Sequence, residues 1–172
     1  MKNYLELIDT DTPGNRNDVT PLFADPAAFS EMIDDLSEPF FGTPVDYVAG
    51  IDALGFILGA AMALKLSRGF IPLRKGGKLP VDATSQEFLD YSGQLKSLEL
   101  RKGMLKLGDR VLLVDEWIET GAQIEAAIKL IEGQGARVIG IAAINIDNNP
   151  RTVKLKKEHR VHALSEEGKF QS

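Results

Sequence analysis

Two adjacent acidic residues, a Thr-Gly pair and a helical pattern follow one another closely in the second half of the chain. Asp115 and Glu116 end an apolar run, and Thr120 and Gly121 precede a helix expected from about Gln123. The free N–H groups and positive dipole end of a helix N-terminus suit a phosphate, and a glycine lets an anion approach the backbone. Carboxylates beside such a site favour sugar hydroxyls or a magnesium ion as partners.

The same residues also fit a purely structural interpretation. Thr120-Gly121-Ala122-Gln123 matches a capping box of the Thr-x-x-Gln kind, in which two side chains satisfy the first backbone groups of a helix without any ligand. The pattern alone leaves both interpretations open.

A basic segment stands out on an acidic chain. Residues 1–64 contain 11 acidic and 2 basic residues, and the net charge of the whole chain is −5, which argues against general nucleic-acid binding. A basic segment on an acidic chain suits the binding of a small polyanion, and a solvated surface that binds no ligand is an equal alternative. Its five basic residues, with no acid among them, are Lys65, Arg68, Arg74, Lys75 and Lys78.

Two strand–loop–helix units position these residues. Unbroken apolar strands separated by helices predict an α/β fold, with a mainly parallel twisted sheet flanked by helices. Ligands of such sheets bind at the carboxyl ends of the strands. The first unit comprises a strand at Val45–Ile51, a loop at Asp52–Gly55 and an apolar helix at Phe56–Leu66; the second comprises a strand at Arg110–Asp115, a turn at Glu116–Ala122, a helix at Gln123–Glu132 and a strand at Arg137–Ile144.

The remaining stretches carry weaker signals. Asp25 followed by Pro26 predicts the start of a helix that runs to about Leu36. Residues 75–109 are polar with no clear period, and we expect a long flexible loop there; an active-site lid, an inserted hairpin and disorder are the alternatives. Short strands are expected at Phe70–Arg74 and Arg160–Leu164, and the tail after Asn149 is otherwise weakly patterned.

Length and composition bound the class of protein. The 172 residues, 44% of them hydrophobic, suit one domain spanning residues 1–172 with a sizeable core. The absence of cysteine excludes disulfides, thiolate zinc sites and a cysteine nucleophile. No apolar run is long enough to cross a bilayer, and Met1–Glu6 does not begin a signal peptide, so we expect a cytoplasmic protein without a membrane partner.

The segment Val111–Gln123 resembles the motif of type I phosphoribosyltransferases that binds phosphoribosyl pyrophosphate (PRPP). Further segments resemble the adenine phosphoribosyltransferases of that family, with consistent spacing from about residue 15 to residue 145. They are Asp18–Leu22, Asp25–Phe29, Asp46–Gly59, Arg74–Pro80 and Leu89-Asp90-Tyr91.

The resemblance implies transfer of the phosphoribosyl group of PRPP to a purine base, with release of pyrophosphate. Asp115 and Glu116 would accept hydrogen bonds from the ribose hydroxyls. The turn Glu119, Thr120, Gly121, Ala122 and Gln123 would hold the 5′-phosphate. Pyrophosphate and its magnesium would lie beside Asp52, Ala53, Leu54, Gly55, Arg74, Lys75 and Lys78.

Asp90 matches the acidic residue of the family that assists proton transfer to the purine, within a loop expected to close as a lid that excludes water. Mg²⁺ is expected to arrive mainly with PRPP, so no protein ligand set is assigned to it. The resemblance also implies a homodimer.

Three departures from the family pattern leave alternatives open. Leu54 replaces an arginine that contacts pyrophosphate, a loss of about 1.5–3 kcal/mol. Compensation by Arg74 or Lys75 is one alternative, and a regulatory module that binds PRPP or a nucleotide with little turnover is the other. Ala122 and Gln123 replace Gly and Thr, which removes one phosphate-binding hydroxyl. Glu119 replaces a small residue, so it is a second candidate acid or base and favours a 6-oxopurine substrate as a further alternative.

Trp117 is also unusual in the motif. Packing beneath the loop and stacking on a base are the two roles that the sequence leaves open for its indole.

Overall fold

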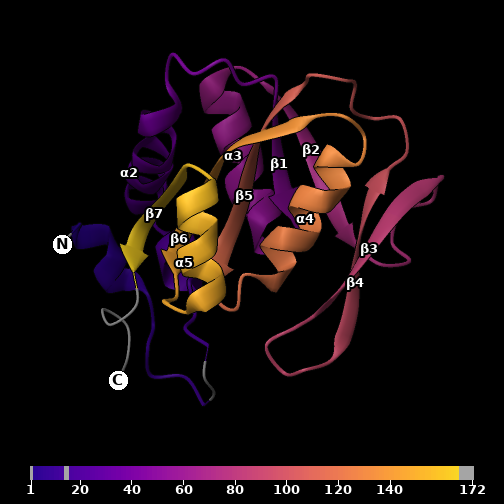
Figure 1. Cartoon of the computed structure of the whole chain (residues 1–172). Helices are drawn as coiled ribbons and strands as arrows, with labels where there is room; N and C mark the ends of the chain where they lie inside the picture. The colour runs from indigo at the N-terminus through magenta and orange to yellow at the C-terminus, as the bar shows by residue number, and fades with distance from the viewer. Residues whose placement is uncertain (1, 14–15, 167–172) are drawn as a thin grey trace.

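A mixed β-sheet forms the centre of the molecule (Figure 1). The computed structural model describes residues 2–13 and 16–166. The described residues form a seven-stranded sheet in the order β3-β4-β2-β1-β5-β6-β7, in which β2, β1, β5, β6 and β7 run parallel and the pairs β2–β4 and β3–β4 are antiparallel. The predicted α/β fold is therefore confirmed. The strands are β1 (Tyr47–Ile51), β2 (Gly69–Lys75), β3 (Ala83–Leu89), β4 (Leu95–Arg101), β5 (Arg110–Ile118), β6 (Arg137–Ile146) and β7 (Val161–Glu166).

Helices cover both faces of this sheet. Helix α4 lies on one face with the β3–β4 hairpin, and α2 and α3 lie on the other (Figure 1). Helices α3, α4 and α5 form the crossovers between successive parallel strands. The helices are α1 (Thr20–Ala24), α2 (Pro26–Ser37), α3 (Leu54–Leu66), α4 (Ala122–Glu132) and α5 (Pro150–Glu158), with short 3₁₀ helices at Asn3–Leu7 and Glu38–Phe40.

Strand β5 is buried on both faces because its apolar side chains alternate between two cores. Val111 and Leu113 pack with Ile128 of α4, whereas Leu112 and Val114 belong to the core built with α2 and α3. All four strand side chains are fully buried, and each contributes about 1.5–3 kcal/mol relative to an exposed position. This continuous apolar strand fixes the place where Asp115 emerges.

Glycines allow α3 to approach the sheet closely. A Cβ atom on Gly55 would lie 2.9 Å from the carbonyl oxygen of Val114, and one on Gly59 would lie 2.8 Å from the ring of Phe70. A Cβ atom on Gly50 of β1 would collide with the carbonyl oxygen of Gly55. The first turn of α3 is therefore held firmly against β1 and β5.

The expectation of a long flexible loop between residues 75 and 109 needs correction, because this stretch contains an antiparallel hairpin. Strands β3 and β4 pair from Ala83↔Arg101 to Leu89↔Leu95. Only Leu98 and Leu100 of the hairpin are fully buried. The alternation of apolar and polar residues that identifies a strand in a sequence therefore covers few residues here. The inserted hairpin was one of the three alternatives open for this stretch.

Helix boundaries confirm one prediction and correct two others. Asp25 Oδ1 accepts hydrogen bonds from the N–H groups of Ala27 and Ala28, so α2 begins as predicted. Strand β5 continues beyond Asp115 to Ile118, and α4 begins at Ala122, so the turn between them is shorter than expected. Helix α5 was not predicted. None of the helices formed by the described residues has the length and apolarity needed to cross a membrane.

Candidate active site

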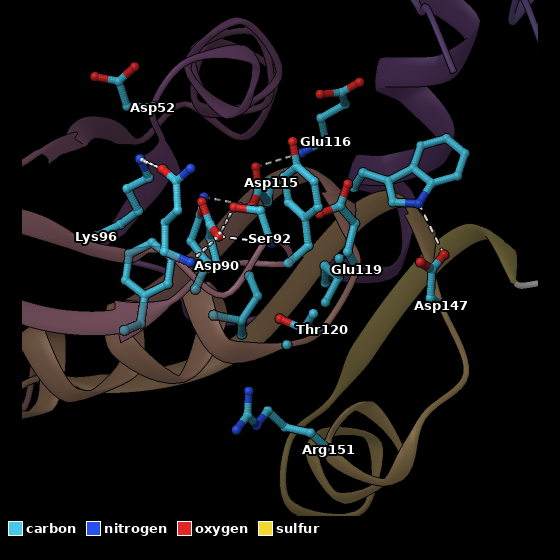
Figure 2. Close-up of a pocket in the computed structure, with 18 of the residues that line it drawn as sticks. Asp52, Asp90, Ser92, Lys96, Asp115, Glu116, Glu119, Thr120, Asp147 and Arg151 are labelled. Atoms are coloured by element: carbon cyan, nitrogen blue, oxygen red, sulfur yellow. Dashed lines mark hydrogen bonds between the residues drawn. The ribbon is translucent and has the colours of Figure 1, made fainter. Parts of the chain in front are cut away.

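A cleft of about 1500 Å³ opens at the carboxyl ends of the parallel strands (Figure 2). The β1–α3 loop, the β5–α4 loop, the β6–α5 loop, the tip of the β3–β4 hairpin and the chain around Arg16 all contribute to its walls. Segments far apart in the sequence therefore meet at one edge of the sheet, as expected for an α/β fold.

The β5–α4 loop forms the floor beside the start of α4. Gly121 is the N-cap residue, with φ at 81°, and a Cβ atom there would lie 3.1 Å from Leu155. Thr120 Oγ1 accepts a hydrogen bond from the Ala122 N–H at 3.3 Å, whereas the Gln123 side chain donates to Asp115 Oδ2 at 3.4 Å. The capping box is therefore not formed, because Gln123 turns towards the acidic pair instead of the helix start.

The acidic pair lies in a strongly perturbed environment. Burial raises the pKa of Asp115 to about 8, and the neighbouring Glu116 and Glu119 add to this effect while Lys75 opposes it. Burial also raises the pKa of Glu116 to about 7. Asp115 Oδ1 accepts a hydrogen bond from the Glu116 N–H at 2.9 Å, which orients its carboxyl group. Buried carboxyl groups of this kind are suited to hydrogen-bond donors such as sugar hydroxyls.

Glu119 extends the acidic pair along the cleft. Its Oε1 lies 3.3 Å from Nε of Arg16, and its backbone carbonyl accepts a hydrogen bond from Asn149 Nδ2 at 2.8 Å. Burial raises the pKa of Glu119, and Arg16 opposes that shift. The loop is thus held from two sides, by the chain near the N-terminus and by the start of α5.

The β1–α3 loop borders the other end of the cleft. Asp52 Oδ2 lies 3.4 Å from Nε of Arg74, and the peptide bond between Asp52 and Ala53 is cis. Leu54 begins α3, lines the cleft and packs against the α2–α3 core. Lys75 lines the same end.

Asp90 lies at the tip of the β3–β4 hairpin. Its Oδ1 accepts hydrogen bonds from the Ser92 N–H at 2.9 Å, the Ser92 hydroxyl at 2.7 Å and the Gln94 N–H at 3.0 Å. These bonds hold the pKa of Asp90 below its usual range. The Asp90 side chain therefore stabilises the turn between β3 and β4, and it also lines the cleft.

Most of the residues singled out in the sequence line the cleft. Of those given a role in binding or catalysis, four do not: Arg74 pairs with Asp52, Lys78 is exposed outside the cleft, and Gly55 and Ala122 are buried. Lys65 and Arg68 of the basic segment also lie outside the cleft. The predicted site residues that line the cleft are Asp52, Ala53, Leu54, Lys75, Asp90, Asp115, Glu116, Glu119, Thr120, Gly121 and Gln123.

Several cleft residues were missed by sequence reasoning. Arg16 carries one of only two positive charges among the first 64 residues, a signal that could have marked it; its guanidinium lies 4.4 Å from the centre of the Tyr91 ring. Arg151 follows the Asn149-Pro150 pair that starts α5, lies against Gly121 and pairs with Glu125 at 3.4 Å. The same cap-and-proline signal that predicted α2 would have found α5.

Trp117 is half-buried at the edge of the cleft, and its Nε1 donates a hydrogen bond to Asp147 Oδ1 at 3.0 Å (Figure 2). Asn145 Nδ2 donates to the same oxygen at 2.9 Å. The indole is thus anchored at its nitrogen.

A cleft at the carboxyl ends of the parallel strands, with an acidic pair near the end of β5 and a Thr-Gly loop at a helix start, suits a phosphorylated sugar. Residues 22–171 match the phosphoribosyl transferase domain family, and the chain belongs to this family.

Relatives and solved structures are similar over most of the chain. An adenine phosphoribosyltransferase of Dinoroseobacter shibae is 43% identical over 150 residues, which are 86% of this chain and 83% of the relative. The crystal structure of adenine phosphoribosyltransferase from Rhodothermus marinus has a TM-score of 0.86 at 32% identity, covering 96% of this chain and 97% of that chain. The Giardia lamblia enzyme complexed with 9-deazaadenine has a TM-score of 0.87 at 30% identity, covering 96% of each chain.

Proposed function

We propose that the protein transfers the phosphoribosyl group of PRPP to adenine, forming adenosine monophosphate and pyrophosphate. The observation that carries this proposal is the arrangement of Asp115 and Glu116 next to the Thr120-Gly121 loop at the start of α4, in one cleft. The relatives named adenine phosphoribosyltransferases support adenine as the base.

The β5–α4 loop is the proposed site of the ribose 5-phosphate part of PRPP. Asp115 and Glu116 accept hydrogen bonds from the ribose hydroxyls, and in their ionised form they favour the positive charge that develops at the anomeric carbon. Thr120, Gly121 and the first N–H groups of α4 receive the 5′-phosphate. Gln123, which donates to Asp115 at 3.4 Å, orients the acidic pair in place of the hydroxyl that the family pattern has.

The β1–α3 loop and Lys75 are the proposed pyrophosphate end. We expect a magnesium ion to arrive on PRPP, since Mg²⁺ typically keeps waters and takes substrate phosphates with one or two carboxylates. Asp52 is the carboxylate at this end, and a bound Mg²⁺ would supply charge neutralisation to the leaving pyrophosphate.

Pyrophosphate release tests the reaction. The protein is incubated with PRPP, Mg²⁺ and adenine, hypoxanthine or guanine in turn, and pyrophosphate is measured. Release with adenine alone supports the proposal, and release only with hypoxanthine or guanine contradicts adenine as the base and favours the substrate that Glu119 suggested.

A binding module with little turnover is the second candidate, and Leu54 favours it because an apolar side chain lines the pyrophosphate end of the cleft. This candidate predicts no release with any base but thermal stabilisation by PRPP. At a PRPP concentration 100-fold above Kd, the stabilisation is about 2.7 kcal/mol.

The proposal also includes a homodimer and a cytoplasmic location, which the family resemblance suggested. Light scattering at several protein concentrations tests the first, and fractionation of cells that produce a tagged protein tests the second. A monomer at all concentrations contradicts the dimer.

A further inference from the structure

The proposed 5′-phosphate site lies among acidic side chains. Asp115, Glu116 and Glu119 line the same part of the cleft, and Glu125 adds an acid in the first turn of α4. A phosphate monoester carries about 1.5–2 negative charges at pH 7, whereas a helix N-terminus offers only about half a positive charge. A cation beside the β5–α4 loop is therefore needed to offset the repulsion between the phosphate and these acids.

Four basic side chains line the cleft, and one of them lies at this loop. They are Arg16, Lys75, Lys96 and Arg151. The two lysines come from β2 and β4, and Arg16 pairs with Glu119 and lies over the Tyr91 ring. Of the four, Arg151 is the one whose side chain lies against Gly121.

We propose that Arg151 binds the 5′-phosphate of the substrate and makes the cleft selective for a ribose that carries this group. The inference rests on the proposed function. It adds to the β5–α4 loop a residue from the start of α5, a separate segment of the chain. The ligand class is a ribose 5-phosphate ester, which includes both PRPP and a nucleoside monophosphate.

The backbone of Gly121 provides the surface on which the Arg151 side chain packs. A Cβ atom at position 121 would lie 3.3 Å from Cγ and 3.4 Å from Cδ of Arg151. Figure 2 shows the Arg151 side chain leaving α5 and lying beneath Thr120 in that view. Because its methylene groups are packed on the loop, the side chain has less conformational freedom to lose when a phosphate binds.

The guanidinium of Arg151 has one edge occupied and one edge available. Its Nε lies 3.4 Å from Oε2 of Glu125, and this is the one ion pair that Arg151 forms within residues 2–13 and 16–166. The two Nη groups make up the other edge of the planar fork, and two parallel N–H groups of this kind match two phosphate oxygens. Glu125 therefore holds the guanidinium in place without using the edge that suits a phosphate.

The cap of α5 keeps Arg151 in register with the loop. Asn149 Oδ1 accepts hydrogen bonds from the N–H groups of Arg151 and Thr152, and its Nδ2 donates to the carbonyl of Glu119 at 2.8 Å. The first turn of α5 and the β5–α4 loop are thus joined through one side chain. The guanidinium supplies donors that the loop itself lacks, since Gln123 donates to Asp115 instead.

Two ligands that differ only in the 5′-phosphate test the contact. Calorimetric titration measures Kd of adenosine monophosphate and of adenosine for the wild type and for Arg151→Gln, which removes the charge and the fork. We expect Kd of adenosine monophosphate to rise about ten- to a hundredfold and Kd of adenosine to stay within about threefold. Lys157→Gln removes one charge from an exposed position of the same helix and is the matched control, with both Kd values unchanged.

Arg151→Lys separates the charge from the fork and guards against a misfolded glutamine variant. Lysine keeps the charge but binds as a single ammonium group, so its Kd for adenosine monophosphate should lie between those of the wild type and Arg151→Gln. The KM for PRPP should follow the same order, while the KM for adenine stays within about threefold of the wild type.

The outcomes distinguish this inference from the proposed function. A wild type that binds adenosine monophosphate, with Kd unchanged in Arg151→Gln or with adenosine weakened equally, overturns the role of Arg151 alone. A wild type that binds neither PRPP nor adenosine monophosphate, and releases no pyrophosphate with any purine, overturns the proposed function and this inference together.

Discussion

At the residue scale, burial keeps a proton on Asp115 that an exposed aspartate would lose. Its pKa is raised to about 8 from an ordinary value of 3.8. Between these values the folded protein binds more protons than the unfolded chain, so this residue makes the free energy of unfolding fall as pH rises.

Asp115→Asn should raise the thermal stability most at pH 8–9 and have little effect near pH 3, where the wild-type carboxyl is protonated in the folded protein and mostly protonated in the unfolded chain. Each kcal/mol gained raises Tm by about 2–4 °C for a chain of this size, and melting curves from about pH 3 to pH 9 measure it. Glu116, with a pKa raised from 4.5 to about 7, changes the stability in the same direction over a narrower pH range.

Asp46→Asn is a control with the opposite sign. Hydrogen bonds from Arg110 lower the pKa of Asp46 to about 2, so its stabilising effect is present at neutral pH and is lost as pH falls towards 2. The Asp46 variant should melt below the wild type at pH 7. A Tm of Asp115→Asn that is lower than the wild type at pH 9 would contradict the assigned burial effect.

Leu54 offers a second prediction at this scale. Leu54→Arg should lower KM for PRPP by about ten- to a hundredfold, because a charge-assisted hydrogen bond contributes about 1.5–3 kcal/mol. Steady-state kinetics with varied PRPP measure the change. Leu54→Met, which keeps an apolar side chain of similar volume, should leave KM near the wild-type value; equal KM values for the arginine and methionine variants would refute the prediction.

At the element scale, Asn149 joins the start of α5 to the β5–α4 loop. Its Oδ1 accepts from the N–H groups of Arg151 and Thr152 at 3.0 and 3.1 Å, and its Nδ2 donates to the carbonyl of Glu119. Asn149→Ala should cost about 0.5–2 kcal/mol through the lost cap and should raise KM for PRPP because the loop loses its support.

Asn149→Asp distinguishes the two contributions. Aspartate keeps the acceptor oxygen of the cap but cannot donate to the Glu119 carbonyl. It should keep most of the stability and still raise KM, as measured by thermal melting and steady-state kinetics. An aspartate variant with wild-type KM would show that the hydrogen bond does not support the loop.

The sequence predicted the elements whose signal is local and continuous. The apolar β5 and the Asp25-Pro26 start of α2 were found because one strand or one cap carries the whole signal. The hairpin was only one of three alternatives for its stretch, because its core side reduces to Leu98 and Leu100. Arg16, Arg151 and Asp147 were missed for a different reason: they reach the cleft from distant segments, and only the packing of those segments brings them there.

At the scale of the whole molecule, Gln134 fastens the hairpin to the rest of the fold. It follows α4, and its Nε2 donates to Thr84 Oγ1 at 3.3 Å and to the Arg101 carbonyl at 3.0 Å. Its Oε1 accepts from the Leu105 N–H at 3.2 Å. One side chain therefore contacts both hairpin strands and the segment that leads into β5.

Gln134→Ala should loosen the hairpin selectively, with a cost of about 1–3 kcal/mol for the hydrogen bonds lost. Hydrogen exchange of the β3 and β4 amides should become faster while that of α4 and β6 is unchanged. Uniform acceleration over the whole chain would show that the hairpin and the central sheet open as one unit.

The close seating of α3 on glycines has a consequence for how this chain can change. Gly50, Gly55 and Gly59 leave no space for side chains where α3 meets β1 and β5, whereas the neighbouring position 54 faces the cleft. The three glycine positions therefore cannot accept a larger side chain without displacing α3, whereas position 54 can. A substitution at position 54 is therefore expected to change binding at the proposed pyrophosphate end while the contact of α3 with β1 stays as it is.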